Sequence, residues 1–244
     1  MFSGGLEELF LLKGHRVPEN LAQQIDKASA YKAALHVVSR EVNPDFAPYD
    51  VHEWDVRNRF VDVPFKLLQL KALTVMAADV FDIRWDSEER CWVLPIRSPK
   101  GELWGYQFRQ KGAHPNTQPE GIAKSQTLFG LSAMRRYRDV MVVESPLDAV
   151  RCFSIGIPSV ATMGMYVSDT QATLLARNFT RVVIAMDNDE AGDRGARVLG
   201  HMLDRRRTYH SRLSYHRLGD AKDPGEVEDN VVLLAAWRDA RRLF

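Results

Sequence analysis

Short apolar runs alternate with segments of helical periodicity over the second half of the chain. The apolar runs, rich in β-branched residues, occupy 140–144, 158–162, 181–186 and 213–218. Between them the apolar positions recur with helical spacing, at 146–155, 168–178 and 190–207. This alternation predicts an α/β fold, a four-stranded parallel sheet flanked by helices with right-handed crossovers. Ligands of such sheets gather at the carboxyl ends of the strands.

The first half has a different pattern. An apolar run at 91–97 and an alternating run at 102–109 flank Ser98-Pro99-Lys100-Gly101, which predicts a two-stranded hairpin around a Pro/Gly turn. We therefore expect a smaller mixed α+β subdomain at 64–138, followed by the parallel-sheet domain at 139–230.

Both ends of the chain are predicted to be helical. Helical periodicity runs through 20–42, and Pro44–Pro48 is typical of a linker. The N-terminal region 1–63 is therefore an adaptor for a partner or a packing element, and we favour packing. The C-terminal segment 231–244 is predicted to be an amphipathic helix whose arginines form a solvated face.

Composition narrows the class of protein only slightly. A content of 45% hydrophobic and 27% charged residues is that of an ordinary globular protein, and the net charge of +1 means that any basic surface is local. Two cysteines are too few for a zinc site or a disulfide framework and favour a reducing cytoplasm. No apolar run is long enough to cross a membrane, and the start lacks the pattern of a signal peptide. We expect a cytoplasmic protein with no membrane partner.

Two aspartates follow the apolar run at 181–186. Side chains two residues apart in an extended chain point to the same side, so Asp187 and Asp189 can face one spot. At about 5 Å and an effective dielectric of about 20 their repulsion is roughly 3 kcal/mol, which calls for a counter-charge. A divalent cation such as Mg²⁺ or Mn²⁺ suits carboxylate ligands. The alternative is a solvated acidic turn that caps the next helix.

Further acidic residues follow two other predicted strands. Glu144 ends the first strand of the domain, and Asp148 lies one turn into a helix that Pro146 is placed to begin. Asp223 and Glu226 come after the fourth strand. Taken singly, Glu144 is explained by the helix dipole and the Asp223 segment by a plain Pro-Gly turn. Three acidic turns after three strands of one parallel sheet favour a shared metal site.

These acidic motifs resemble a known family. Glu144-x-x-x-Asp148 at one strand–helix junction and Asp187-x-Asp189-x-x-Gly192 at another are similar to the Toprim domain of bacterial primases, topoisomerases, repair nucleases and recombination proteins. The resemblance covers roughly 139–230. Gly192 fits it because a small residue lets the helix approach the sheet closely.

Four more segments favour the DnaG-type, bacterial or phage-like, primase branch. They resemble primase segments in the same order: Lys71-Ala72-Leu73-Thr74 before a helix, the hairpin with Pro95-Ile96-Arg97 and Gly105-x-x-x-Arg109, Lys124-x-x-x-Leu128-Phe129-Gly130-Leu131, and Lys222-Asp223-Pro224.

The chain departs from the primase pattern at several points. Ser145-Pro146 stands where the family usually has a glycine, and Asp223-Pro224-Gly225 stands where primases often read D-P-D, so that Glu226 is a candidate for the missing acid. No cysteine set for a zinc module and no helicase phosphate-binding loop occur in this sequence. The chain therefore resembles a catalytic core that works with separately encoded partners.

The resemblance implies a DNA primase catalytic core that makes short RNA primers on single-stranded DNA by Mg²⁺- or Mn²⁺-dependent nucleotidyl transfer. It implies Glu144, Asp187 and Asp189 as catalytic residues and metal ligands, with Asp148 and Asp223 as supporting ligands. For nucleotide and DNA binding the candidates are Arg97, Arg109, Lys124 and Lys222; the alternative for each is a solvated surface charge. The implied partners are a single-stranded DNA template, ribonucleoside triphosphates, a separate replicative helicase and a separate zinc-binding module.

Two other classes remain open. A Toprim nuclease would use the same acids with water as the nucleophile, whereas a topoisomerase would need a nucleophilic tyrosine, for which none of the seven has a suitable context. A non-catalytic Toprim DNA-binding module would keep the fold and lose the chemistry; the full set of acids argues against it.

Overall fold

A computed structural model of the protein describes residues 59–110, 115–118 and 120–241, all within one compact unit, Pro44–Phe244. The helix expected at 20–42, the linker at Pro44–Pro48 and the last three residues lie outside the described part of the chain. Among the described residues, no helix has both the length and the apolar character that a membrane span requires.

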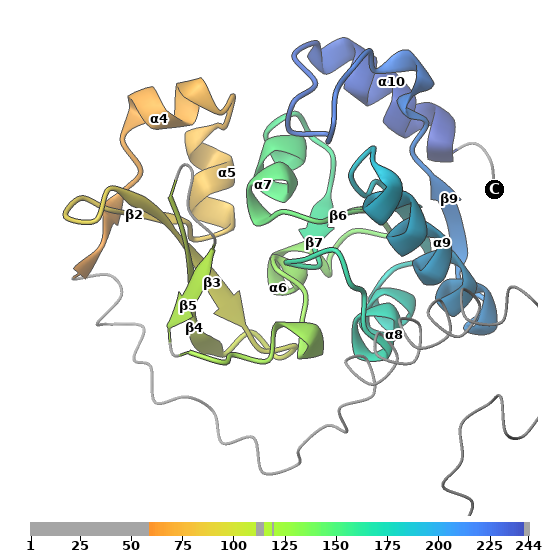
Figure 1. Ribbon diagram of the computed structural model, residues 1–244, viewed down its shortest axis with the longest axis horizontal. Coiled ribbons are helices and arrows are strands. Elements are labelled where there is room, and N and C mark those ends of the chain that lie inside the picture. Colours follow the sequence, from red (N-terminus) through yellow and green to blue (C-terminus); the bar gives the residue numbers. More distant parts are fainter. Residues whose placement is uncertain (1–58, 111–114, 119, 242–244) are drawn as a thin grey trace, which may run out of the picture. The chain divides into compact units, whose positions relative to one another are not determined.

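The first sheet of the described chain is antiparallel, with the strand order β1-β2-β3-β4-β5 (Figure 1). Its strands are β1 (Val61–Asp62), β2 (Arg84–Asp86), β3 (Cys91–Arg97), β4 (Leu103–Arg109) and β5 (Asn116–Gln118). β3 and β4 form the hairpin expected over 91–109. Two short helices, α4 (Phe65–Leu70) and α5 (Val75–Val80), accompany this sheet; α5 begins at Thr74, whose hydroxyl accepts the backbone N–H of Ala77 at 3.1 Å.

The second sheet is parallel and has the order β7-β6-β8-β9. Its strands are β6 (Asp139–Val143), β7 (Ser159–Ala161), β8 (Arg181–Ile184) and β9 (Tyr209–Arg212). They alternate with α7 (Pro146–Ser154), α8 (Asp169–Asn178) and α9 (Glu190–Arg205), and α10 (Asn230–Arg241) follows. The predicted four-stranded parallel sheet flanked by helices is therefore confirmed.

Chain direction places the helices on the two faces of this sheet. The connection from β6 to β7 runs opposite to those from β7 to β8 and from β8 to β9, so right-handed crossovers put α7 on one face and α8 and α9 on the other (Figure 1). α10 packs on β8 and β9. The carboxyl ends of β6 and β8, which are neighbours, meet at one edge, as a shared site requires.

The fourth strand lies earlier in the chain than predicted. The apolar run at 213–218 is not a strand: residues Tyr215–Arg217 form a 3₁₀ turn, and the strand is β9, Tyr209–Arg212. β9 is an edge strand with largely exposed positions, so it carries polar residues and lacks the apolar run of a central strand. Leu213 and Leu218 are buried because they anchor the two ends of the turn.

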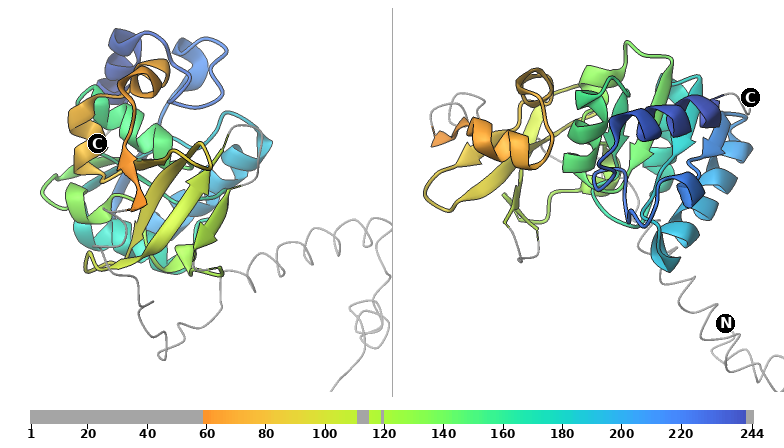
Figure 2. Two further views of the ribbon diagram at one scale, coloured as in Figure 1. Left: turned by 90° about the vertical axis from the view of Figure 1, so that its left-hand side faces the viewer. Right: turned by 90° about the horizontal axis from the view of Figure 1, so that it is seen from above.

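Contacts between α5 and α7 join the two sheets (Figure 2). Phe81, which ends α5, stacks on Phe129 with ring centroids 5.3 Å apart and meets Phe153 of α7 edge-on at 5.5 Å. Phe129 also pairs with Ala161 of β7, beyond the 3₁₀ turn Lys124–Gln126 and before α6 (Leu131–Met134). These aromatic contacts therefore fix the position of the antiparallel sheet relative to the parallel sheet.

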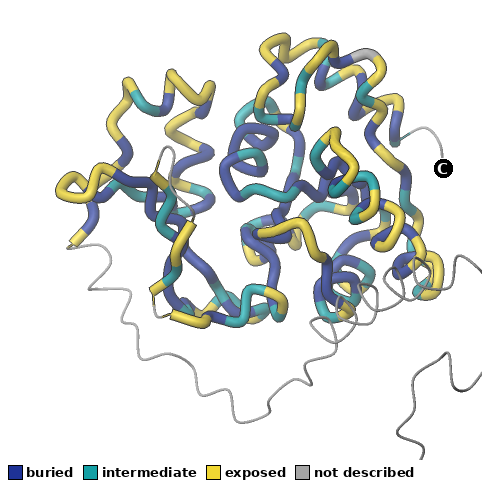
Figure 3. The backbone as a smooth tube through the Cα atoms, in the orientation of Figure 1, coloured by how far each residue is buried: buried dark blue, intermediate teal, exposed yellow. Residues whose placement is uncertain are grey.

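Burial is deepest along the parallel sheet (Figure 3). Every residue of β6 is buried, and Val140, Met141, Val142 and Val143 have no exposed surface. Helices on both faces explain why this strand is apolar at consecutive positions. A rigid strand ending at Val143 fixes the position of the next residue, Glu144.

Candidate metal centre

Acidic side chains from three segments meet at the carboxyl edge of the parallel sheet. Asp148 lies in the first turn of α7, Asp187 follows β8, and Asp223 lies in the loop before α10. One carboxylate oxygen from each lies within 4.8 Å of the others. The structure thus brings together one aspartate expected as a primary ligand and the two expected to support it.

Glu144 and Asp189 border this cluster. The Oε1 of Glu144 accepts the backbone N–H of Asp187 at 3.2 Å, so the tips of β6 and β8 do converge as the sequence suggested. Asp189 begins α9, and its Oδ1 accepts the N–H of Gly192 at 2.9 Å. One oxygen of each carboxylate is therefore used by the backbone, and the second oxygen of Asp189 lies 3.9 Å from Nζ of Lys222.

Two glycines allow the acids to come this close. A Cβ at Gly192 would overlap the backbone of Asp187, so only glycine lets α9 start against this turn. A Cβ at Gly225 would overlap Oδ1 of Asp148 and lie 3.0 Å from Oδ1 of Asp223. Gly225 occupies the position that we identified as a departure from D-P-D; its missing side chain leaves room for two of the three aspartates.

Burial and mutual repulsion raise the pKa values of three acids. Burial, followed by the charges of Asp223 and Asp187, holds the pKa of Asp148 well above its usual range. Burial and the charge of Asp187 raise the pKa of Glu144. Burial raises the pKa of Asp223, although the N–H of Glu226 that its carboxylate accepts opposes this. A bound cation would stabilise the ionised form of carboxylates whose pKa values are raised in this way.

Lys222 supplies the nearest positive charge. Its Nζ lies 3.2 Å from Oδ2 of Asp187 and 3.9 Å from Oδ2 of Asp189, and the ion pair with Asp187 raises the pKa of the lysine. Its carbonyl accepts the N–H of Asn188 at 2.6 Å, and its own N–H is accepted by Glu226 at 3.0 Å. These hydrogen bonds connect the loop that contains Asp223 with the turn that contains Asp187. Within that loop, Glu226 accepts a backbone N–H.

The other basic candidates are spread around the site. Arg109, the last residue of β4, donates to the Ser145 hydroxyl at 3.1 Å, and its positive charge opposes the rise in the pKa of Asp148. Arg97 is ion-paired with Asp82 at 2.8 Å. Lys124 lies in the 3₁₀ turn packed on α8, where burial lowers its pKa. Arg109 and Lys222 are therefore the basic candidates that act directly on the acidic cluster.

Tyr215 is a neighbour of the cluster that the sequence did not reveal. Burial and then the charge of Asp187 raise the pKa of its phenol, with further effects from Asp223 and Asp148. Among the described residues, no hydrogen-bond partner exists for this buried hydroxyl. Its position inside a predicted strand hid it, because only the 3₁₀ turn directs it to the acids. Two aromatic side chains of β4, Tyr106 and Phe108, belong to the first sheet's core, where they pack on Phe60.

The acidic cluster fits a hard divalent cation. All three donors are carboxylate oxygens, the ligand type that Mg²⁺ prefers, and the three atoms lie within 4.8 Å of one another. Phosphate oxygens of a bound nucleotide could complete the coordination, as is usual for Mg²⁺.

Comparison with known proteins agrees with this geometry. Residues 141–227 match the family model described as Toprim-like, which identifies a Toprim-like domain in this chain. The chain is 32% identical over 111 residues to the DNA primase of Aquifex aeolicus, an alignment covering 41% of this chain and 22% of that protein. The chain thus spans about a fifth of the length of this relative.

Solved structures share the fold over a longer stretch. The primase fragment of the bacteriophage T7 primase-helicase protein superposes with a TM-score of 0.62 at 16% identity, covering 80% of each chain. The DnaG primase catalytic domain bound to ssDNA superposes with a TM-score of 0.61 at 19% identity, covering 72% of this chain and 71% of that one. The expected fold, a Toprim-like parallel sheet preceded by a smaller mixed α+β subdomain, is confirmed.

Proposed function

We propose that this chain is the catalytic core of a DNA primase, which joins ribonucleotides into short primers on a single-stranded DNA template. The observation that carries the proposal is the meeting of Asp148, Asp187 and Asp223 beside Glu144, in a fold shared with primase catalytic cores. The curated relatives named DNA primase support the same conclusion. In this reaction a 3′-hydroxyl attacks the α-phosphate of the next nucleotide, and pyrophosphate leaves.

We assign the cation to the aspartate cluster as Mg²⁺ or Mn²⁺. Bound there, such an ion orients the triphosphate and stabilises negative charge on the reacting oxygens. Glu144 uses one oxygen to accept the N–H of Asp187, and its other oxygen is placed to accept a proton at the sheet edge; Asp189 borders the cluster with its Oδ2 near Lys222. Asp148, Asp187 and Asp223 thus act as the inner ligands in this proposal.

Basic side chains of the chain position the substrates. The side chain of Lys222 is 56% exposed, so its ammonium could contact a phosphate oxygen of the substrate in place of Asp187. Arg109 fixes the Ser145 hydroxyl and faces the same edge from the first sheet. We assign Arg97 and Lys124 to the path of the template, where contacts to phosphates give affinity without reading sequence.

The partners we propose follow the same relatives. The single-stranded DNA template and ribonucleoside triphosphates are the substrates. The matched T7 protein is a primase-helicase, and a matched Aquifex aeolicus primase structure includes a zinc-binding domain. We propose that a helicase and a zinc-binding module assist this chain.

The test is oligonucleotide synthesis on single-stranded DNA from ribonucleotides with Mg²⁺ or Mn²⁺. We expect primers from the full chain and a loss of at least about 100-fold in Asp187→Asn and Asp148→Asn, because electrostatic stabilisation of this kind supplies several kcal/mol. The matched control is Asp220→Asn, an exposed acid of the same loop, which should keep full activity.

Other results would change the assignment. Metal-dependent cleavage of the template without synthesis would make the chain a Toprim nuclease. DNA binding that the acid variants leave intact, with neither synthesis nor cleavage, would make it a binding module.

A further inference from the structure

A cavity lies at the end of the parallel sheet opposite to the acidic cluster. It has a volume of about 820 Å³, within the usual size of small-molecule sites. The first residues of three adjacent strands, Asp139, Arg181 and Tyr209, line it in register across β6, β8 and β9. Glu144 follows the other end of β6, about 17 Å away for a strand of this length. A ligand in this cavity therefore does not share the metal centre.

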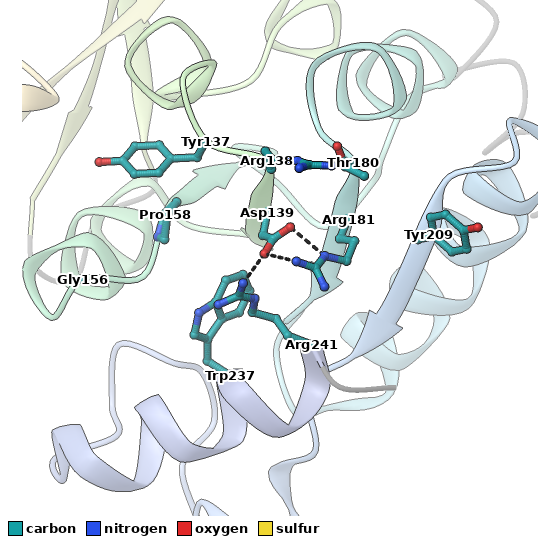
Figure 4. A pocket seen from close by; sticks show the side chains of 10 residues that line it. All are labelled: Tyr137, Arg138, Asp139, Gly156, Pro158, Thr180, Arg181, Tyr209, Trp237 and Arg241. Carbon is teal, nitrogen blue, oxygen red and sulfur yellow. Dashed lines mark hydrogen bonds and ion pairs between the residues drawn. The ribbon is translucent and has the colours of Figure 1, made fainter. Parts of the chain in front are cut away.

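Positive charge predominates in this cavity. Arg181 holds Asp139 through two bonds of 2.7 Å, and Arg241 pairs with the same carboxylate (Figure 4). Arg138, which is exposed, also lines the cavity, so three arginines and one aspartate contribute to its lining. Among the described residues, no acceptor exists for the buried Nε of Arg241. Planar guanidinium groups in excess over acids are suited to phosphate.

Aromatic rings flank the charged cluster. In Figure 4, Tyr137 and Tyr209 lie on either side of the Asp139 cluster, and Trp237 lies under Arg241. The Arg241 guanidinium is 5.4 Å from the centroid of the Trp237 ring, so the tryptophan holds this cation in place. Tyr209 is 65% exposed although it is a large aromatic residue on an edge strand. An exposed ring that lines the same cavity as these guanidinium groups can stack on a nucleobase whose phosphate they bind.

We propose that this cavity binds a nucleotide unit, with its phosphate on the guanidinium groups of Arg138, Arg181 and Arg241 and its base against Tyr209. The unit is either a free nucleotide or part of a single strand, since both carry the same phosphate and base. This site does not depend on the proposed primase activity. Asp139 serves as a positioning residue, because its carboxylate orients two arginines from β8 and α10.

The test measures binding by the full chain in EDTA, so that no cation recruits phosphates to the acidic cluster. The probes are fluorescently labelled ADP and a labelled short single-stranded oligodeoxynucleotide. The variants are Tyr209→Ala and Arg138→Gln, both at exposed positions. The control is Arg90→Gln, an exposed arginine in the turn between β2 and β3 of the other sheet.

We expect Tyr209→Ala to weaken binding at least about fivefold, the lower end for loss of one base–aromatic stack. Arg138→Gln should weaken it and reduce its salt dependence, because one phosphate contact is lost, and Arg90→Gln should leave it unchanged. Asp187→Asn should also leave this binding unchanged while it abolishes synthesis, which separates this site from the proposed function.

The two probes distinguish the sources of the ligand. Weakened ADP binding in the variants identifies a free nucleotide, and weakening confined to the oligonucleotide identifies a strand. Failure of both probes to bind without metal, or equal binding by wild type, Tyr209→Ala and Arg138→Gln, would overturn the proposal.

Discussion

Gly225 lies directly against Asp148, although 76 residues separate them in the chain: a Cβ on the glycine would overlap Oδ1 of the aspartate. The same ideal Cβ position lies 3.0 Å from Oδ1 of Asp223. The absence of a side chain at residue 225 therefore leaves room for the Asp148 carboxylate beside the loop before α10. The size of the acidic cluster depends on this contact.

Gly225→Ala should weaken cation binding more than it weakens the fold. Asp148 can turn its carboxylate away from a new methyl group, which costs little packing but removes one ligand from the cluster. We expect a loss of at least about tenfold in Mn²⁺ affinity, with a change of about 1 kcal/mol or less in unfolding free energy. Mn²⁺ titration and thermal unfolding check this. The control is Gly164→Ala, since nothing lies within 4 Å of its ideal Cβ; equal Mn²⁺ affinity in both variants would contradict the prediction.

Gly192→Ala should instead damage the fold. Its Cβ would overlap the backbone of Asp187, which cannot move without shifting β8 or α9. Overpacking of this kind costs about 1–3 kcal/mol or more, and the displaced Asp187 should also reduce Mn²⁺ affinity. Denaturant unfolding beside Gly164→Ala measures the cost. Stability equal to that of the control would show that the turn of Asp187 is more adaptable than the contact implies.

Lys222→Gln should raise the affinity for a cation and lower the rate of primer synthesis. The lysine competes with a cation for Asp187 and Asp189, so its removal should raise Mn²⁺ affinity by about fivefold, the equivalent of roughly 1 kcal/mol for an exposed ion pair. Primer synthesis should nevertheless fall at least about tenfold if the lysine also contacts the triphosphate. Lys66→Gln, at an exposed position on α4, is the control. Unchanged synthesis would remove Lys222 from the substrate contacts.

The metal-free protein should lose stability relative to Asp148→Asn as pH rises. The pKa of Asp148 is well above its ordinary value of 3.8 in the folded state, so the folded chain keeps a proton that the unfolded chain releases. Between these two pKa values, folding stability falls with rising pH, and above the folded pKa the penalty is complete. Asparagine at this position does not titrate and removes the penalty.

Thermal unfolding in EDTA from about pH 4 to pH 8 measures this difference. The wild-type protein and Asp148→Asn should be similar at the acidic end, and the variant should become the more stable protein towards neutral pH. Added Mg²⁺ should restore the stability of the wild-type protein and should raise that of the variant less. A difference in stability that does not change with pH would contradict the raised pKa.

Much of the fold follows from local patterns. The consecutive apolar positions of β6 and β8 predicted buried parallel strands, and helical spacing predicted α7, α8 and α9. β9 was missed because an edge strand lacks the apolar pattern of a central one, and the apolar positions at Leu213 and Leu218 proved to anchor a 3₁₀ turn.

The candidate site was predictable in part for the same reason. Acids directly after β6 and β8 had to lie at one edge, because parallel strands bring their carboxyl ends together, and Glu144 does meet Asp187 there. No local pattern ranks the acids. One carboxylate oxygen each of Asp148, Asp187 and Asp223 lies within 4.8 Å of the others, and Asp189 caps α9 beside them.

The sequence by itself determined the strand and helix periods, the order of the elements and the edge at which the acids gather, since each depends on neighbouring residues. Only the tertiary structure decided which carboxylates share a cluster, how Gly225 and Tyr215 border it, and that Asp139, Arg181 and Arg241 line a second cavity. These relations join residues far apart in the chain, and their distances depend on how the loops and helices pack. No local period encodes such distances.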